Sequence, residues 1–284
     1  MPNLRILYDN AADRVVSITA SGVVTGFPAT NMQNEYKGKV CRTNTVVSST
    51  RSTSYTLEWA SSEVVGGVIL PAINLSASST IRIRLYSDQA GALAPIYDSG
   101  VQYACPGSNL EYWNWNFPLN GNAFAFGGVA KVSIWCANSN QYSCRRLVID
   151  LSDTISLATT IDCSRIVCGA YWEPQHNFER SSLNITIADT STSSRNNAGD
   201  LLSDRGIVHD QLSFNFALLP EGDKQELMKI MRSTGSSKNI VVSIFPGENE
   251  VSEQDYLIYG KRSNSAVGST YHKYYSNSLE LIGW

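Results

Sequence analysis

The sequence has little charge, little histidine and no long hydrophobic run, and each shortage excludes a class of protein. Charged residues make up 17% of the 284 positions and leave a formal net charge of -3. Proteins that hold nucleic acid neutralise phosphates with clustered lysine and arginine, so no nucleic-acid partner is expected. The best apolar run, residues 64–75, is broken by Gly66, Gly67 and Pro71 and is too short for a membrane span. Hydrophobic residues nevertheless reach 43%, which excludes a disordered chain.

Catalytic and cofactor signatures are also missing. The glycines never form the G-x-x-x-x-G-K-[ST] pattern of a phosphate loop, and no G-x-S-x-G nucleophile turn is present. Paired carboxylates, which a glycosidase places on both sides of a cleft, occur as Asp150 with Asp153 and as Glu248 with Glu250. We interpret these pairs as solvated loop charges. The sequence therefore predicts a protein with no enzymatic activity, no catalytic residues and no cofactor.

Cysteine and histidine do not show metal-site spacing. The closest cysteine pairs, Cys136 with Cys144 and Cys163 with Cys168, match no zinc, redox or iron–sulfur pattern. Cys136 and Cys168 follow apolar strand residues, which is typical of thiols that pack as small apolar side chains. We predict buried reduced thiols and no metal, with a metal or iron–sulfur site as the alternative.

The first residues bear on the compartment. Asp9 and Asp13 occur before any apolar run has formed, unlike the start of a secretory signal peptide. We therefore expect a protein that is made and kept in a cytoplasm.

The first half favours strands over helices. In residues 80–86, Ile81, Ile83 and Leu85 alternate with Arg82, Arg84 and Tyr86, which is the period-2 pattern of a strand with one buried face. Further short strands are predicted at 14–20, 55–59, 67–70, 129–135 and 145–151. Many short strands at near-regular spacing are typical of an antiparallel β-sandwich. No helix is predicted before residue 160.

The second half adds one helix to further strands. Leu212, Phe214 and Phe216 share one face of a predicted strand at 210–216. A helix is predicted near 220–233, because Pro220 suits a first helical turn and Gly235 suits a helix stop. Other strands are predicted at 164–172, 182–187, 238–245 and 256–260.

Three segments of the first half resemble discoidin-like (galactose-binding-like) sandwich domains. They are the loop at 31–34 leading to 40–43, the strand at 56–59 followed by 66–76, and the strand and turn at 81–88. The segment at 66–76, GGVILPAINLS, matches the family's strand end of the form x-N-L-S. The resemblance implies a discoidin or jelly-roll type of sandwich. The predicted fold is thus mostly β, with an N-terminal antiparallel β-sandwich over 1–158 and a C-terminal β-rich domain with one short helix over 159–284.

Several segments spread over the whole chain carry a second resemblance. They are LRILYDNAADR at 4–14, VCGAYWEP at 167–174, RNNAGDLL at 195–202, LSF at 212–214, SIFP at 243–246 and IYGK at 258–261. In these segments the chain resembles tail-tip or baseplate proteins of long-tailed bacteriophages, distal tail proteins among them. The resemblance implies a structural protein of the virion tail, assembled in the host cytoplasm. It implies a homo-oligomeric ring between the tail tube and the receptor-binding parts, with tube, hub and tail fibre proteins as partners.

The segment at 112–117 is the most conspicuous candidate site. As a strand it places Trp113 and Trp115 on one side and Tyr112, Asn114 and Asn116 on the other. Flat rings beside amide side chains suit a host-surface glycan, because rings stack on sugar CH faces while amides bond to hydroxyls. The favoured interpretation is that the tryptophans pack in a core or against a neighbouring subunit. A glycan-binding module and a tail-associated polysaccharide hydrolase remain the alternative functions.

A long polar loop is predicted over 189–204. Its Asp189, Asn196, Asn197, Asp200 and Asp204 offer the oxygen atoms that Ca²⁺ prefers, although their spacing is that of no known calcium loop. Aspartate and asparagine also fill turns for backbone reasons. A further interpretation is that this loop reaches a neighbouring ring subunit.

Overall fold

The computed structural model describes residues 2–47, 50–76, 79–105, 130–154, 159–247, 251–271 and 274–284. These residues lie mostly in strands and form two compact units. The sandwich unit contains Asp9–Trp172 and Ile244–Leu257, and the C-terminal unit contains Asn3–Tyr8, Glu173–Ser243 and Ile258–Trp284. The predicted domain boundary between residues 158 and 159 stays a prediction.

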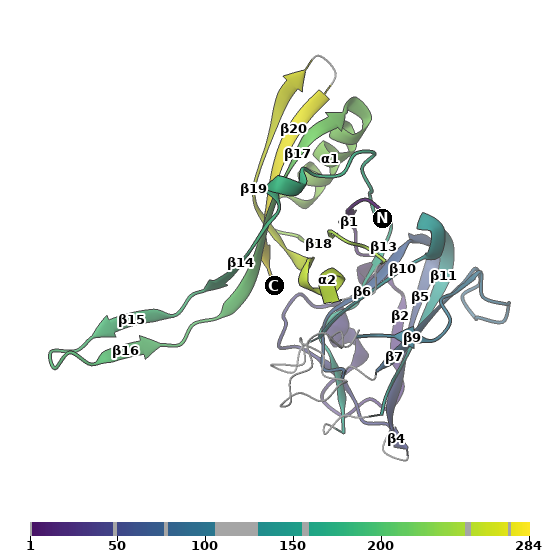
Figure 1. The fold of residues 1–284 in the computed structure, drawn as a ribbon. Coiled ribbons are helices and arrows are strands. Elements are labelled where there is room, and N and C mark those ends of the chain that lie inside the picture. The colour runs from purple at the N-terminus through teal and green to yellow at the C-terminus, as the bar shows by residue number, and fades with distance from the viewer. Residues whose placement is uncertain are drawn as a thin grey trace. The chain divides into compact units, whose positions relative to one another are not determined.

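Two antiparallel sheets form the sandwich unit (Figure 1). Its strands are β2 (Ser17–Ala20), β3 (Cys41–Thr43), β4 (Val46–Val47), β5 (Thr50–Val65), β6 (Gly67–Ile73), β7 (Thr80–Tyr86), β8 (Tyr97–Asp98), β9 (Gln102–Tyr103), β10 (Ala130–Trp135), β11 (Tyr142–Asp153), β12 (Ile161–Cys163) and β13 (Val167–Gly169). Among the described residues, one sheet has the order β2-β5-β11-β7-β8, with β4 on β5 and β9 on β7. The other has the order β10-β6-β12-β3, with β13 on β6. The predicted antiparallel β-sandwich is confirmed.

Alternating side chains build the core between these sheets. In β7, Ile81, Ile83 and Leu85 are buried, while Thr80 and Arg82 point to the outer face, as the alternation predicted. β5 alternates in the same way over most of its length. The inward residues of both sheets belong to one hydrophobic cluster. Removing apolar surface from water stabilises such a core by about 25 cal/mol per Å².

The register of the larger sheet arranges its outward side chains in rows. On β11, Asp150 lies opposite Ser54 of β5 on one side and Arg82 of β7 on the other. Ser152, two residues further along β11, lies opposite Ser52 and Thr80 in the same way. Residues that are directly opposite share a face of the sheet, so each row runs straight across three strands.

A late segment of the chain belongs to the sandwich unit. It contains the short helix α2 (Val251–Asp255). The Glu253 carboxylate is 2% exposed and accepts hydrogen bonds from Ser133 Oγ at 2.7 Å and from Trp135 Nε1 at 2.9 Å, both on β10. This helix was not predicted, because so short a helix has no periodic apolar pattern and depends on tertiary contacts.

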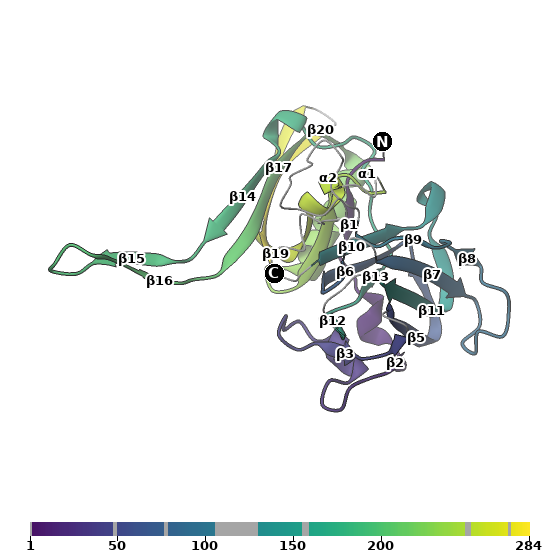
Figure 2. The ribbon, with the colours of Figure 1, turned by 60° about the horizontal axis from the view of Figure 1, so that its bottom comes forward.

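The C-terminal unit is a sheet with one longer helix (Figure 2). Its strands are β1 (Arg5–Leu7), β14 (Asn184–Asp189), β15 (Thr192–Arg195), β16 (Leu201–Asp204), β17 (Val208–Pro220), β18 (Asn239–Ser243), β19 (Leu257–Tyr271) and β20 (Tyr274–Gly283). Among the described residues, the six-stranded sheet has the order β1-β18-β19-β20-β17-β14. β15 and β16 pair with each other in a separate two-stranded ribbon.

The helix α1 (Glu221–Thr234) packs on β17 and β20. Leu227 and Ile230 are buried on its inner face, and on β17 so are Phe214 and Phe216. Gly235 ends the helix with φ 57°, a left-handed conformation that favours glycine, and its N–H donates to Met231 O at 3.0 Å. The helix predicted near 220–233 is confirmed, and so is the strand face that contains the phenylalanines.

The predicted polar loop over 189–204 is wrong, because most of it is the β15–β16 hairpin. In both ribbon views this hairpin continues β14 and β17 away from the rest of their sheet (Figures 1 and 2). A Cβ on Gly206 would lie 2.3 Å from the Thr190 carbonyl carbon, so only glycine permits the close approach at the joint. Serine and threonine look like loop residues, but they also pair well across two exposed strands.

Candidate functional site

The aromatic segment singled out from the sequence lies outside the described residues. Tyr112, Trp113, Asn114, Trp115 and Asn116 belong to the stretch between residues 105 and 130. Their role as a glycan or subunit contact therefore stays a prediction. The described residues contain two other candidate sites, one in each unit.

The first candidate is a concave region on the outer face of the larger sandwich sheet, with a volume of about 390 Å³. We call it the polar basin. It is lined by Ser21, Ser52, Thr53, Ser54, Thr80, Ile81, Arg82, Val101, Asp150, Leu151 and Ser152. Its floor is formed by the two rows that cross β5, β11 and β7, and hydroxyl groups dominate it.

The two rows supply the polar groups of the basin. One row contains Ser54, Asp150 and Arg82. The other contains Ser52, Ser152 and Thr80 and continues to Tyr103 of β9, which lies opposite Thr80. Tyr103 is 62% exposed, so an aromatic ring borders the row of hydroxyls.

The charges of the basin are compensated within the sandwich unit. Asp150 accepts hydrogen bonds from Ser54 Oγ at 2.8 Å and from Arg84 Nη2. Arg82 makes a two-pronged contact with Asp98, with Nε at 2.9 Å from Oδ1. The hydrogen bond from Arg82 lowers the pKa of Asp98 to about 2, so this pair stays charged throughout the neutral range. The basin thus offers donors and acceptors without an excess of either charge.

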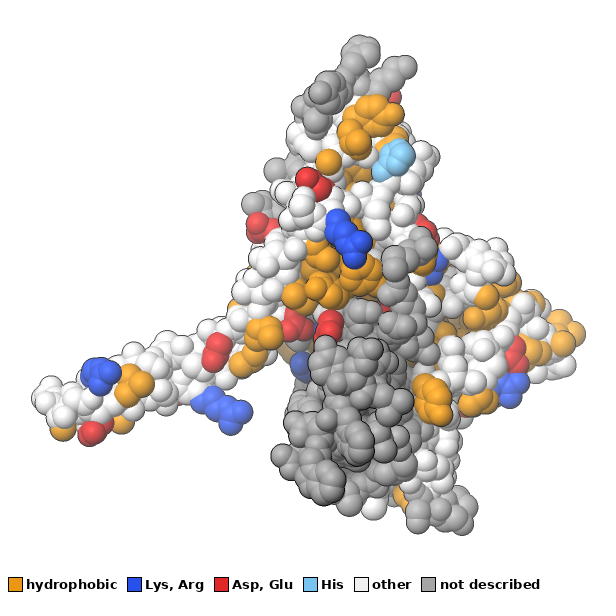
Figure 3. All heavy atoms as spheres, viewed as in Figure 1, with side chains coloured by type: hydrophobic (Ala, Val, Ile, Leu, Met, Phe, Trp, Pro, Cys, Tyr) orange, Lys and Arg blue, Asp and Glu red, His pale blue; other side chains and the backbone are white. Residues whose placement is uncertain are grey.

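The second candidate is the extended hairpin of the C-terminal unit. We call residues 186–208 the arm. No residue of this fully described stretch is buried. It nevertheless contains large apolar side chains, and Figure 3 shows orange side chains spaced along it. The exposed ones are Ile187 (72%), Leu201 (60%), Leu202 (55%), Ile207 (74%) and Val208 (61%).

The polar side chains of the arm form a turn and no metal site. Asn196 Oδ1 accepts from the amides of Ala198 at 3.0 Å and Asp200 at 2.9 Å, and its Nδ2 donates to Asp200 Oδ2. Asp189 accepts from the amide of Ser191, which together with the Ser191 hydroxyl lowers the pKa of Asp189. Among the described residues, no group of three or more His, Cys, Asp or Glu side chains is placed to hold a metal ion.

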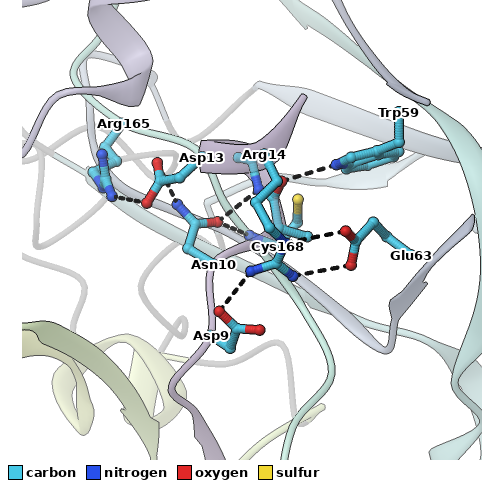
Figure 4. Close-up of polar contacts among 10 residues, drawn as sticks. Asp9, Asn10, Asp13, Arg14, Trp59, Glu63, Arg165 and Cys168 are labelled. Atoms are coloured by element: carbon cyan, nitrogen blue, oxygen red, sulfur yellow. Dashed lines mark hydrogen bonds and ion pairs between the residues drawn. The ribbon is translucent and has the colours of Figure 1, made fainter. Parts of the chain in front are cut away.

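A polar network fixes the first turn of the sandwich unit (Figure 4). The Asn10 side chain accepts from the amides of Ala12 and Cys168 and donates to Ile166 O at 3.1 Å. It thereby joins the 3₁₀ turn at Ala11–Arg14 to β13, and Trp59 Nε1 donates to Ala11 O at 2.8 Å. Asparagine directly before a helical turn is a capping signal in the sequence, and the network is structural.

Arginine–carboxylate pairs flank the same turn. Arg14 bonds to Asp9 at 2.6 Å and to Glu63 at 2.9 Å, and Arg165 bonds to Asp13 at 2.7 Å. Burial raises the pKa of Asp13, and the nearby Arg165 reduces this rise. Arg14 and Arg165 are thus used in ion pairs within the sandwich unit.

The interpretation of Asp150 and Asp153 as solvated loop charges is wrong. Both lie in β11, and Asp153 is 1% exposed. Its Oδ2 contacts Arg51 Nη2 at 2.7 Å and accepts from the Ser76 amide at 2.9 Å. Burial by itself raises the pKa of Asp153, but the contacts with Ser76 and Arg51 prevail and lower it. Glu248 and Glu250 lie outside the described residues.

All six cysteines are buried, as predicted. Cys41 and Cys163 lie opposite each other on β3 and β12. Burial raises the pKa of Cys41 to about 11 and of Cys144 to about 12, and it raises those of Cys163 and Cys168 further. Thiols in this state are poor nucleophiles at neutral pH.

The basin was not predicted from the sequence. A signal was present, because serine occupies every second position at Ser52 and Ser54 and again at Ser152 beside Asp150. Polar residues with period two indicate the outer face of a strand, but not which strands lie side by side.

Among the described residues, no helix is both long enough and apolar enough to cross a membrane.

Comparisons with known proteins give a likeness to solved structures only. No protein-family model and no curated protein matches the chain. Chitosan-binding module 1 of a chitosanase/glucanase from Paenibacillus sp. IK-5 is 15% identical, with a TM-score of 0.35, over 57% of this chain and 99% of that one. CBM32-3 from a family 31 glycoside hydrolase of Clostridium perfringens is 9% identical, with a TM-score of 0.40, over 58% of this chain and 95% of that one. At such identities and TM-scores the likeness assigns no ligand to this chain.

Proposed function

We propose that this chain is a structural protein that assembles with further copies of itself through the arm. The observation that carries the proposal is the arm's exposed apolar surface. An isolated two-stranded hairpin is marginally stable in water, and exposed apolar side chains on unpaired edges invite a partner. Leu201 and Leu202 are neighbours in β16 and therefore point to opposite faces of the ribbon. A partner that covers both faces of the arm would remove both from water.

The proposed setting is the tail tip or baseplate of a long-tailed bacteriophage. Support comes from the sequence resemblance, which includes residues 195–202 at the tip of the arm. In that setting the chain forms a ring with tube, hub and tail fibre proteins as neighbours, and no catalysis is assigned to it. Turnover of cell-wall or capsular polysaccharide by the pure protein would contradict this part of the proposal, as would the absence of the chain from purified particles.

The assembly is tested by measuring mass in solution. Light scattering of the full chain over a concentration series should show an oligomer. Leu201→Asp together with Leu202→Asp should shift it to monomer, because two charges would have to be buried in the interface. Leu93→Asp is the matched control, since Leu93 is an exposed leucine of the sandwich unit, 60% exposed like Leu201. A chain that is monomeric at all concentrations, or an oligomer unaffected by the arm substitutions, would overturn the proposal.

A second candidate function is carbohydrate binding by the sandwich unit. The polar basin favours it, because a concave surface with hydroxyls, a carboxylate, a guanidinium and a bordering aromatic ring suits a polyhydroxylated ligand. Both candidates can hold in one protein, since they use different units. Screening the full chain on a glycan array tests the second candidate, and a complete lack of signal would reject it.

A further inference from the structure

Hydroxyl groups of the basin are available to a ligand. Within the described part of the chain, the hydroxyls of Ser52, Thr80 and Ser152 have no side-chain hydrogen bond, and all three line the basin. Hydroxyls in one row act as donors or acceptors according to the ligand. Asp150 also keeps acceptor capacity, because a carboxylate has about four lone-pair sites and Ser54 and Arg84 each use one.

The balance of charge favours a neutral ligand. Each charged group on the basin floor already has a partner of opposite sign, Arg82 with Asp98 and Asp150 with Arg84. An acidic sugar would therefore find no unpaired cation, and its carboxylate would lie close to that of Asp150. A basic ligand would meet the Arg82 guanidinium, and the Asp150 carboxylate is already paired with Arg84. A ligand with many hydroxyls and no charge fits the arrangement.

An apolar border completes the site. Val101 is 69% exposed and Tyr103 62% exposed, and the register places Tyr103 opposite Thr80, at the end of the hydroxyl row. A pyranose ring has a polar rim of hydroxyls and an apolar face of CH groups, so it contacts both kinds of surface at once. The volume of about 390 Å³ is within the range of roughly 300–1,000 Å³ that small-molecule sites occupy.

We propose that the polar basin binds a neutral pyranose, with its CH face on Tyr103 and its hydroxyls on Asp150, Arg82 and the row of Ser52, Ser152 and Thr80. The inference rests on the second candidate function, carbohydrate binding by the sandwich unit, and assigns to it a site and a ligand class. It concerns a sheet face and is independent of the aromatic segment at 112–117.

The experiment measures binding of defined sugars to the full chain by ligand-observed NMR titration. The probes are methyl glycosides of neutral hexoses and of N-acetylhexosamines, with methyl glucuronide as the acidic comparison. Neutral probes should bind at least ten times more tightly than the glucuronide. Tyr103→Ala should weaken binding about tenfold through loss of the ring contact, and Thr80→Val a few-fold through loss of one hydroxyl. Tyr36→Ala is the matched control, because Tyr36 is 69% exposed in the same unit but, unlike Tyr103, belongs to no strand that continues the rows of the basin.

The possible results of the titration and the array test different parts of the inference. Signal on a glycan array that survives Tyr103→Ala and Thr80→Val would overturn the basin as the site and leave carbohydrate binding in place. Preference for the glucuronide would overturn the neutral class. No binding of any probe and no array signal would overturn both the inference and the second candidate function. Thermal unfolding of each variant checks its fold, and Thr80→Val, which conserves volume on an outward position, keeps the test decisive if Tyr103→Ala unfolds.

Discussion

Among the described residues, the antiparallel ribbon of β5 and β11 in the sandwich unit can be compared with that of β14 and β17 in the C-terminal unit, which is uncovered where it continues into the arm. In the sandwich unit β5 pairs with β11, and the inward residues of both strands lie in the hydrophobic core. In the C-terminal unit the ribbon of β14 and β17 continues into the arm, where no residue is buried. β17 contains both situations, because Phe214 is 1% exposed and Val208 is 61% exposed. Pairing between strands is thus the same in both ribbons, and the difference lies in what packs on their faces.

This difference separates the contribution of apolar burial to stability from that of strand pairing. A covered ribbon is stabilised by apolar burial, which strand pairing alone does not supply. An uncovered ribbon holds its backbone hydrogen bonds but leaves apolar side chains in water. The arm therefore contributes little to the stability of the monomer, and its side chains are free to serve a contact with another chain.

The largest expected loss of unfolding free energy comes from removing a buried ion pair in the covered ribbon. Arg51 and Asp153, on β5 and β11, are 3% and 1% exposed. Arg51→Ala leaves the Asp153 carboxylate buried without its cation and should cost about 3–5 kcal/mol of unfolding free energy. Arg82→Ala, which removes an exposed pair with Asp98, should cost at most about 1 kcal/mol. Urea unfolding of the two variants measures this, and equal losses would contradict the role of burial.

A smaller loss of unfolding free energy is expected when a leucine is replaced in each of the two ribbons. Leu57 on β5 is 0% exposed, and Leu202 in the arm is 55% exposed. Leu57→Ala should cost about 2–5 kcal/mol, because it removes buried methyl groups and leaves a cavity. Leu202→Ala should change the unfolding free energy of the monomer by no more than about 0.5 kcal/mol. Denaturant unfolding below the concentration of any oligomer is the measurement, and a large loss in Leu202→Ala would show that the arm is covered within the monomer.

The smallest expected effect is a pH dependence that differs between the ribbons. The folded pKa of Asp153 lies below its usual value of about 3.9, so the folded state binds fewer protons than the unfolded state near that pH. Its contribution is present above about pH 4 and is lost as the pH falls through the folded pKa. Asp13, whose pKa burial raises, acts in the opposite direction. Asp153→Asn should therefore flatten the acid loss of stability in urea unfolding at about pH 2–5.

Asp189→Asn is the control for the pH measurement. The pKa of Asp189 is also lowered, by the hydroxyl and amide of Ser191, but Asp189 is an exposed residue of the arm. Solvent screens such a contact, so the slope should change much less than in Asp153→Asn. Equal slopes in the two variants would contradict the assignment of the acid dependence to the covered ribbon.

Several elements could be predicted from the sequence because their signals are local. The strand at Thr80–Tyr86 shows in its alternation, and the helix α1 shows in Pro220, Gly235 and the apolar stripe between them. The β15–β16 hairpin could not be predicted, because its serine, threonine and asparagine residues are equally typical of a loop. Asp153 was misplaced for a similar reason. Nothing near it in the sequence indicates Arg51 and Ser76, which surround it in space.

The sequence by itself determined the fold class, because period-two alternation and turn residues act between near neighbours in the chain. It determined the mostly β composition, the buried faces of individual strands and the position of the longer helix. Only the tertiary structure decided which strands lie side by side, and with them the rows that bring Ser52, Ser152 and Thr80 together. It also decided which apolar side chains are covered, so that Leu57 belongs to a core and Leu202 to an open arm. The physical reason is that register and burial depend on contacts between residues far apart in the chain, and local preferences do not encode them.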